Sequence, residues 1–129
     1  MAEIEFLTVE EVLEIHRAQL ERWGGSDGIR DRGALESATA MAQASFGGEY
    51  LHEDLFSMAA AYAFHIAEAQ SFLDGNKRAG LDAALTFLAL NGVRVADPEG
   101  ALFDAMIAIS ARSLSKEGLA RVLRELVDA

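Results

Sequence analysis

The segment from residue 52 to residue 69 places the strongest constraint on the fold. It is a near-continuous run of Ala, Leu, Met, Phe and Tyr, and as a helix it would be apolar on more than one face. Such a helix is stable only when other elements surround it, because its apolar surface must be removed from water. The sequence therefore predicts a central and largely buried helix at 52–69.

Shorter patterns predict two helices before this segment. Thr8 and Glu11 have the spacing of a capping box, and apolar residues then recur at helical period. This first helix is expected to end before Gly24, which is followed by a second glycine. After a loop rich in turn-forming residues, an Ala-, Leu- and Met-rich stretch predicts a second helix at 34–44.

The second half of the chain continues in the same way. Leucines on one stripe predict a helix over residues 76–90, and Asp97 or the neighbouring Pro98 is expected to begin the next one. Residues 93–95 suit a short extended stretch, and Ser115 has the chemistry to cap a last helix. The predicted fold is all-α, with about six helices.

Length and composition favour one domain. The chain has 129 residues, 51% of them apolar, with a single proline and no cysteine. It can bury a core without cross-links, and no repeat or linker divides it, so one compact domain is predicted over residues 1–129. Disulfides and thiolate metal sites are excluded. With no basic and apolar leader and no apolar run long enough to cross a bilayer, we expect a cytoplasmic protein without membrane association.

The charge balance restricts the possible partners. A formal net charge of −10 and a pI near 4.6 argue against binding to nucleic acid, which calls for a basic face. The adjacent cations Lys77 and Arg78 therefore suggest a focused positive site. A basic protein partner would still be attracted to the acidic surface.

The loop around Gly75 has the composition of an anion site. A helix that begins at Gly75-Asn76 presents backbone N–H groups to a phosphate, although by itself such a pair is also an ordinary turn with an N-cap. Lys77 and Arg78 then occupy the first helical turn, where the helix dipole disfavours positive charge. A bound anion explains this choice, and the alternative is solvated cations paired with acids such as Asp82.

Two neighbours in the loop complete this interpretation. Asp74 offers one oxygen ligand, which suits Mg²⁺ held jointly by a carboxylate and nucleotide phosphates. Phe72 is an aromatic residue inside a polar loop, and we expect it to anchor the loop in the core rather than to touch a ligand.

The segment resembles the signature of the Fic/Doc family, in its death-on-curing toxin branch, which reads His-x-Phe-x-Asp/Asn-Gly/Ala-Asn-Lys-Arg. Residues 72 and 74–78 match this pattern. Residues 28–37, 46–49 and 87–92 also resemble the flanking segments of that branch, so the resemblance extends over most of the chain. The combination is much more specific than the loop alone.

The resemblance implies an all-helical toxin that uses ATP and Mg²⁺ to modify a hydroxyl group of a cellular protein. Doc-type members phosphorylate a threonine of elongation factor Tu and stop translation, whereas classical Fic members transfer AMP; the Lys-Arg ending resembles the kinase branch. Carried over, Asp74 would bind the metal, Gly75 and Asn76 would form the anion hole, and Lys77 and Arg78 would hold phosphates. A Phd-type antitoxin would be the partner.

Gln70 departs from this pattern, because the resemblance places the family's general base, a histidine, at that position. Glutamine does not take up a proton near neutral pH, and a positioned base contributes about 10²–10⁴ in rate. Activity is therefore expected to be impaired. Phosphoryl transfer depends mostly on positioning and charge, however, and an amide can orient a hydroxyl, so residual turnover stays possible. A natural variant and an engineered, detoxified toxin are both compatible with Gln70.

Two other functions remain open from the sequence. One is a non-catalytic pseudoenzyme that binds an antitoxin or the family's target. The other is a Fic-type protein adenylyltransferase. Both use the same fold, and they differ from the kinase in what, if anything, is transferred.

The remaining polar residues are given structural interpretations. His65 lies five residues before Gln70 and would point away from it, so it is not expected to replace the missing base. His16 and His65 are interpreted as core residues and His52 as exposed. The loop at 26–31 is interpreted as a polar connection as readily as a recognition element, without a catalytic role. Arg112 and Lys116 could face the loop's opening or solvent.

Overall fold

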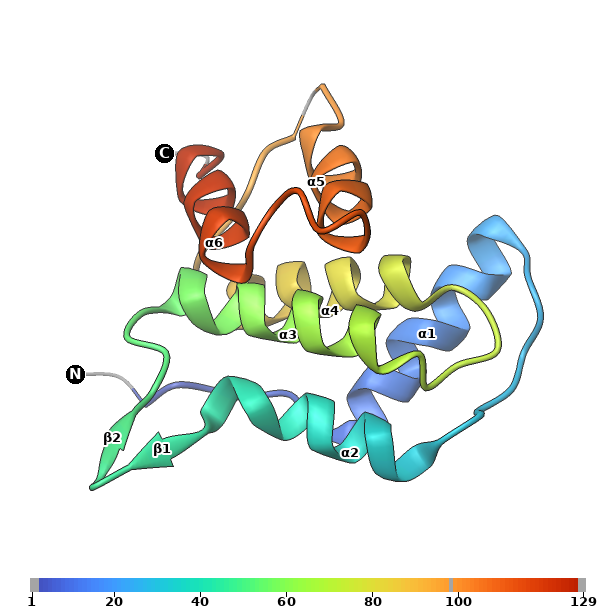
Figure 1. Ribbon diagram of the computed structural model, residues 1–129, viewed down its shortest axis with the longest axis horizontal. Helices are drawn as coiled ribbons and strands as arrows, with labels where there is room; N and C mark the ends of the chain where they lie inside the picture. Colours follow the sequence, from blue (N-terminus) through green and yellow to red (C-terminus); the bar gives the residue numbers. More distant parts are fainter. Residues whose placement is uncertain (1–2, 98, 128–129) are drawn as a thin grey trace.

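Helices dominate the computed structural model, which describes residues 3–97 and 99–127 (Figure 1). This confirms the predicted all-α fold. In chain order the described residues form α1 (Val9–Trp23), α2 (Arg32–Ala40), the 3-10 helix η1 (Met41–Gln43), strands β1 (Ser45–Phe46) and β2 (Glu49–Tyr50), α3 (Leu55–Ala69), α4 (Asn76–Leu90), α5 (Ala101–Ser110) and α6 (Lys116–Glu125).

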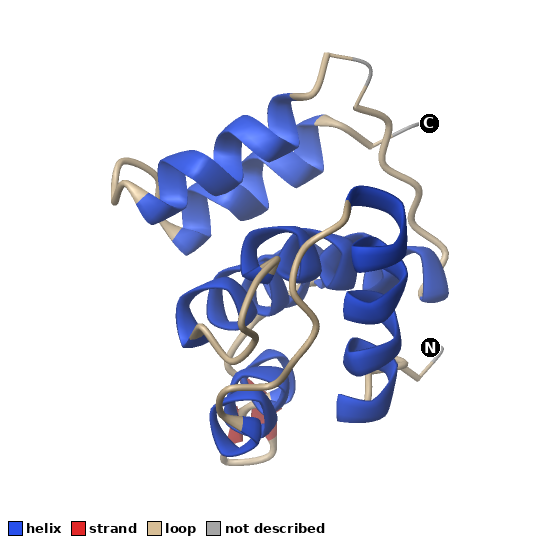
Figure 2. Ribbon diagram, turned by 90° about the vertical axis from the view of Figure 1, so that its right-hand side faces the viewer, coloured by secondary structure: helices blue, strands red, loops and turns tan. Residues whose placement is uncertain are grey.

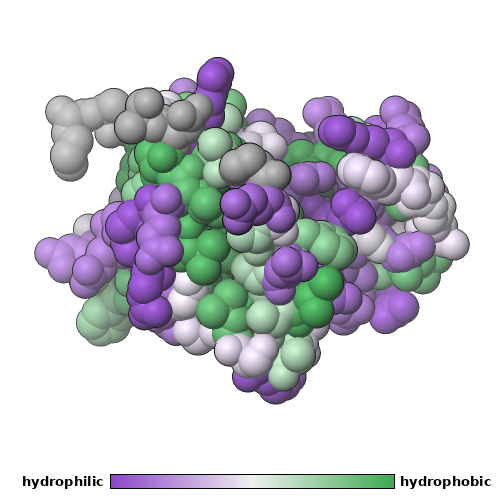
Figure 3. Space-filling model, turned by 90° about the horizontal axis from the view of Figure 1, so that it is seen from above, coloured by the Kyte–Doolittle hydropathy of each residue, from purple (hydrophilic) through white to green (hydrophobic). Residues whose placement is uncertain are grey.

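The central helix is α3, as the sequence predicts. Most of its residues from Met58 to Ala67 are buried, and α1, α2, α4, α5 and α6 contribute most of the remaining core. Figures 1 and 2 show α3 and α4 side by side, with α2 on one side and the α5–α6 pair on the other. Figure 3 looks onto the α5–α6 side, where hydrophobic and hydrophilic side chains alternate.

Gly80 sets the closeness of α3 and α4. A Cβ atom added there would lie 2.6 Å from the backbone oxygen of Ala63 and 3.3 Å from the backbone nitrogen of Ala67. Small residues at this crossing let the two backbones approach. The loop around Gly75 joins the same two helices, so the distance between α3 and α4 also fixes the two ends of this loop.

The variant Gly80→Val is expected to lower the free energy of unfolding by about 1–3 kcal/mol, because the added side chain meets backbone atoms that cannot move aside. Chemical denaturation measures this change. Gly33→Ala is the matched control: Gly33 lies in α2, its added Cβ meets only Asp31 Oδ1 at 3.5 Å, and stability should stay equal or rise. Equal stability of the two variants would contradict the close-crossing account.

The helix starts agree with the predicted caps in several places. Thr8 and Glu11 form the capping box, with Glu11 N donating to Thr8 Oγ1 at 3.1 Å and Thr8 N to Glu11 Oε1 at 2.9 Å. Helix α1 ends at Trp23 as expected, and Ser115 caps α6 by accepting from Gly118 N at 2.9 Å.

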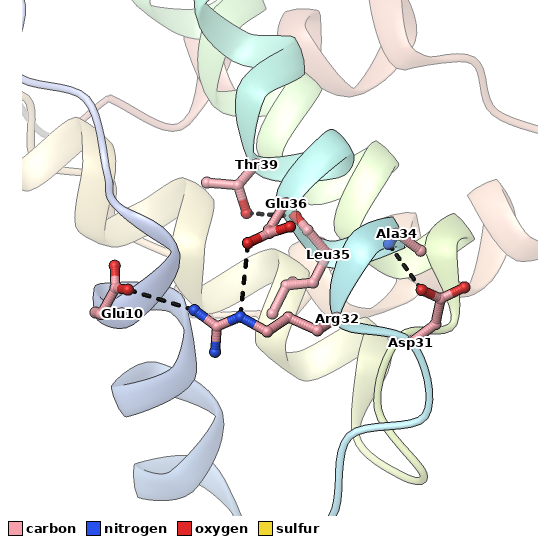
Figure 4. Close-up of polar contacts among 7 residues, drawn as sticks. All are labelled: Glu10, Asp31, Arg32, Ala34, Leu35, Glu36 and Thr39. Carbon is pink, nitrogen blue, oxygen red and sulfur yellow. Dashed lines mark hydrogen bonds and ion pairs between the residues drawn. The ribbon is translucent and has the colours of Figure 1, made fainter.

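The predicted helix at 34–44 is wrong at both ends. Asp31 accepts from Ala34 N at 3.0 Å, so α2 already begins at Arg32. It then tightens into η1 after Ala40. Figure 4 shows that Arg32 also contacts Glu10 of α1, at 3.4 Å, and Glu36, at 3.6 Å. The start of α2 is thereby fixed against α1.

Two other predicted starts lie too early. The helix predicted at 52–69 begins at Leu55, because Asp54 caps it by accepting from Ser57 N at 2.8 Å. Helix α5 begins at Ala101, although the Asp97 carboxylate does accept from the amides of Ala101 and Leu102. Pro98 lies outside the described residues.

Two short extended features accompany the helices. The antiparallel pair β1–β2 was not predicted, and its Phe46 side chain is 82% exposed. Within the predicted extended stretch at 93–95, Val95 forms an isolated bridge with Val127. Among the described helices, none has the length and apolarity needed to cross a membrane.

Candidate functional site

The loop between α3 and α4 is anchored in the core by Phe72, as predicted. The Phe72 ring is fully buried and stacks on the His16 imidazole, with ring centroids 3.7 Å apart. His16 Nε2 also lies 2.8 Å from the Asp74 backbone oxygen. His16 is buried, as expected of a core residue, and α1 thereby fixes the loop directly beneath the predicted site.

Asn76 closes the loop onto itself. Its Oδ1 accepts from Phe72 N at 3.0 Å, and its Nδ2 donates to Phe72 O at 3.0 Å. The side chain is therefore committed to the loop backbone. What Asn76 can offer to an anion is its backbone N–H at the start of α4.

The segment at 26–31 braces the loop from outside. Leu73 N donates to Gly28 O at 3.1 Å, and Arg30 N donates to Ser71 O at 2.6 Å. Ser26 N donates to Asp74 Oδ2 at 3.3 Å. The sequence analysis left two interpretations open for this segment, a polar connection and a recognition element. These hydrogen bonds support the polar connection.

Helix α4 begins without a side-chain cap. Its N-cap is Gly75, with φ 76° and ψ 21°, and no side chain accepts from the first amides of the helix. A Cβ atom at Gly75 would also collide with the buried side-chain amide of Gln19. A glycine is therefore suited to this position both by conformation and by space, and the first-turn amides are left to an external acceptor.

Asp74 lies at the edge of this turn. Its Oδ1 accepts from Gly75 N at 2.9 Å, in addition to the contact of Oδ2 with Ser26 N. The residue is exposed. Its two backbone contacts orient the carboxylate, and each oxygen keeps a further lone pair for a cation.

The two adjacent cations are not used in ion pairs within the described part of the chain. The Arg78 guanidinium instead lies over two aromatic rings, 4.3 Å from the centroid of Trp23 and 4.7 Å from that of Phe103. Burial raises the pKa of Asp82, and the nearby Arg78 and Arg22 act in the opposite direction. The sequence analysis gave pairing of these cations with Asp82 as the alternative. No such ion pair is present among the described residues.

These residues line one hollow of about 280 Å³. All the residues that the sequence analysis named for the site contribute to it. Its lining consists of Gln70, Leu73, Asp74, Gly75, Asn76, Lys77, Arg78 and Phe103. An anion in this hollow would meet helix amides and two cations together.

Gln70 ends α3 in a left-handed conformation, with φ 51° and ψ 40°. Its Nε2 donates to Ala67 O at 2.8 Å, which satisfies one of the free carbonyls at the helix end. The side-chain NH₂ is thus held by α3 itself. Oε1 is the atom of Gln70 that can accept a hydrogen bond from a ligand.

Comparison with known proteins identifies the family. Residues 6–88 match the model of the Fic/DOC family. The chain belongs to the Fic/Doc family. It is 36% identical over 121 residues to a protein of Escherichia phage P1 named protein kinase doc, covering 93% of this chain and 94% of the relative. It is 39% identical over 92 residues to toxin Doc of Mycolicibacterium smegmatis, covering 71% of this chain and 68% of the relative.

Two other histidines of this Fic/Doc domain lie together outside the hollow. His52 Nε2 and His65 Nε2 are each 3.2 Å from Lys116 Nζ. Burial, together with Lys116, lowers the pKa of His65 to about 4, and the same two causes lower the pKa of His52. His52 is half-buried, so its predicted exposure is wrong, and half-buried His65 is not a full core residue.

Arg112 and Lys116 do not line the hollow. Arg112 Nη1 lies 3.8 Å from Glu68 Oε1, while Lys116 faces the two histidines. The Arg112 side chain is 82% exposed, so it faces solvent, one of the two possibilities drawn from the sequence. Lys116 is half-buried against the two histidines, so for this residue neither possibility is correct.

Sequence reasoning missed the residues that support the site from other elements. Trp23 and Phe103 contact Arg78, and Gln19 lies against Gly75. They come from α1 and α5, far from the loop in sequence. The one available signal was Trp23, a large aromatic residue placed directly before Gly24-Gly25.

Proposed function

We propose that this Fic/Doc domain is a Doc-like toxin that binds ATP and Mg²⁺ at the α3–α4 loop. The proposed chemistry is phosphorylation of a threonine of elongation factor Tu, which would stop translation in the cytoplasm. The names of the two relatives, protein kinase doc and toxin Doc, support this type of function. The observation that carries it is the uncapped start of α4 beside two cations that form no ion pair among the described residues.

The hollow suits a polyphosphate. The first-turn amides of α4 and the helix dipole favour a negative group at this end. Lys77 adds a mobile point charge, whereas the planar guanidinium of Arg78 can bind two phosphate oxygens at once. Two adjacent cations in an acidic protein give this hollow a local positive charge that would favour phosphates.

The donor set also fits Mg²⁺ carried by a nucleotide. Asp74 supplies an oriented carboxylate at the rim, and Mg²⁺ commonly takes one or two carboxylates plus substrate phosphates. Among the described residues no group of three or more His, Cys, Asp or Glu could hold a metal by itself. Asp74 is therefore proposed as the protein ligand of a metal that arrives with ATP.

When bound, Mg–ATP supplies the phosphoryl group, and the chain's residues position it. We place Gln70 where the family's general base is expected. Its Oε1 can orient the attacking hydroxyl, but the proton must be lost to solvent or to the phosphate instead. Orientation without proton uptake predicts a slow reaction rather than a different one.

The structure also favours a second candidate, a pseudoenzyme that binds without transferring. The hydrogen bond from Gln70 Nε2 to Ala67 O secures the end of α3, so Gln70 has a structural use that needs no chemistry. In either case the proposed partner is a Phd-type antitoxin. The net charge of −10 would attract a basic antitoxin segment.

The test is incubation of the native protein with purified elongation factor Tu, Mg²⁺ and ATP labelled at either the γ- or the α-phosphate. Slow transfer of γ-label is expected, and Asp74→Asn should abolish it because the metal carboxylate is lost. Transfer of α-label alone would instead indicate an adenylyltransferase. Saturable ATP binding with no transfer would favour the pseudoenzyme, and absence of ATP binding would contradict the proposed nucleotide site.

A further inference from the structure

The Arg78 guanidinium is enclosed by rings from two helices that are distant in sequence. Trp23 is the last residue of α1, and Phe103 lies in the first turn of α5. Their centroids lie 4.3 and 4.7 Å from the guanidinium carbon. Both distances are within the range of cation–π attraction. Three elements of the fold thus meet at one side chain of the hollow.

This arrangement holds Arg78 without consuming its hydrogen-bond donors. Aromatic rings attract the face of a guanidinium, whereas its N–H groups point outward in the plane. Arg78 enters none of the ion pairs found among residues 3–97 and 99–127. The five N–H groups therefore stay available to an oxyanion, and the rings restrict where they point.

Core packing does not account for Trp23, since 56% of the residue is exposed. It contacts a second cation as well, because the Arg22 guanidinium carbon lies 5.2 Å from its ring centroid. The half-buried Asp82 carboxylate lies near both arginines and offsets part of their charge. A phosphate in the adjacent hollow would add a second negative partner for Arg78.

We propose that Trp23 and Phe103 are positioning residues, which hold the Arg78 guanidinium in the orientation that binds nucleotide phosphate. This inference rests on the proposed function and adds residues from α1 and α5 to the site. It predicts that the aromatic rings contribute to nucleotide affinity only through Arg78. Loss of a ring should therefore weaken binding without unfolding the domain.

The experiment measures Mg–ATP affinity by isothermal titration calorimetry. Trp23→Leu keeps apolar bulk but removes the ring, and we expect about 2- to 30-fold weaker binding, the range of a cation–π contact. Trp23→Phe keeps a ring and should recover most of the affinity. Phe56→Leu is the matched control: it removes a ring 5.3 Å from the Arg124 guanidinium, outside the hollow, and should leave affinity unchanged.

A double-mutant cycle separates this inference from the proposed function. In an Arg78→Ala background, Trp23→Leu should cause no further loss of affinity, because the contact it acts through is gone. Equal losses from Trp23→Leu with and without Arg78 would overturn the positioning role while leaving the nucleotide site intact. If the native protein failed to bind Mg–ATP, both the inference and the proposed function would be overturned.

Fluorescence gives a second measurement that is independent of calorimetry, because Trp23 is the single tryptophan of the chain. The account predicts that Arg78→Ala changes the emission of Trp23, and that Mg–ATP changes it saturably in the native protein. An emission spectrum that is the same with and without the Arg78 side chain would overturn the contact itself.

Discussion

Replacing Gln70 with histidine is expected to raise the rate of phosphate transfer from ATP to elongation factor Tu by about 10²–10⁴-fold. The imidazole would accept the proton of the attacking hydroxyl while the phosphoryl group passes to its oxygen and ADP leaves. Gln70 already lines the hollow that holds the proposed phosphate ligands. Histidine also suits the backbone, because it is among the non-glycine residues enriched in the left-handed region that Gln70 occupies.

The measurement is the initial rate of γ-label transfer by the native protein and the Gln70→His variant at equal concentration. Gln70→Asn is the matched control: it keeps an amide and tolerates the left-handed backbone, but it provides no base, so it should not gain activity. Expression of Gln70→His without an antitoxin should arrest growth. Equal transfer rates for all three proteins would show that position 70 does not limit the reaction.

Removing both cations of the hollow is expected to weaken Mg–ATP binding by about 10²-fold or more. Each charged hydrogen bond to a phosphate contributes about 1.5–3 kcal/mol, and Lys77→Ala with Arg78→Ala removes both charged side chains at the start of α4. Neither side chain forms an ion pair within the described residues, but Arg78→Ala also removes the contacts with Trp23 and Phe103, so chemical denaturation must show that the double variant is folded. Calorimetric titration of the double variant measures the effect.

A charge-matched control distinguishes a local site from general attraction. Arg121→Ala with Arg124→Ala removes the same number of positive charges from α6, outside the hollow. This control should bind Mg–ATP with native affinity at moderate ionic strength. Similar weakening in both double variants would assign the binding to overall charge and would contradict the proposed site.

The number of helices and the central position of α3 could be predicted because they depend on local periodicity and on one unusually apolar segment. The capping box at Thr8 and the cap at Ser115 were predictable for the same reason, since each cap acts over three residues. The predicted starts of α2 and α3 were wrong because in each case the capping residue lies beside a longer Ala-rich apolar segment. Asp31 and Asp54 each fix a start that the Ala-rich patterns did not reveal.

The hollow was partly predictable because its polar lining is contiguous in sequence. Residues 70 and 74–78 form one loop and one helical turn, so reading the sequence brings them together. The supporting side chains of His16, Trp23 and Phe103 depend on how α1 and α5 pack against α4, which no local pattern encodes. The short β1–β2 pair escaped prediction because two residues per strand carry no periodicity.

The most direct test of the account is an NMR titration of the isotope-labelled native protein with a non-hydrolysable ATP analogue and Mg²⁺. The account predicts saturable shifts of the backbone amide resonances of Gly75, Asn76, Lys77 and Arg78, at the uncapped start of α4. The amides of α6, which do not line the hollow, should stay in place. Saturable shifts confined to other helices, or no shifts at millimolar nucleotide, would contradict a nucleotide-phosphate site at this loop.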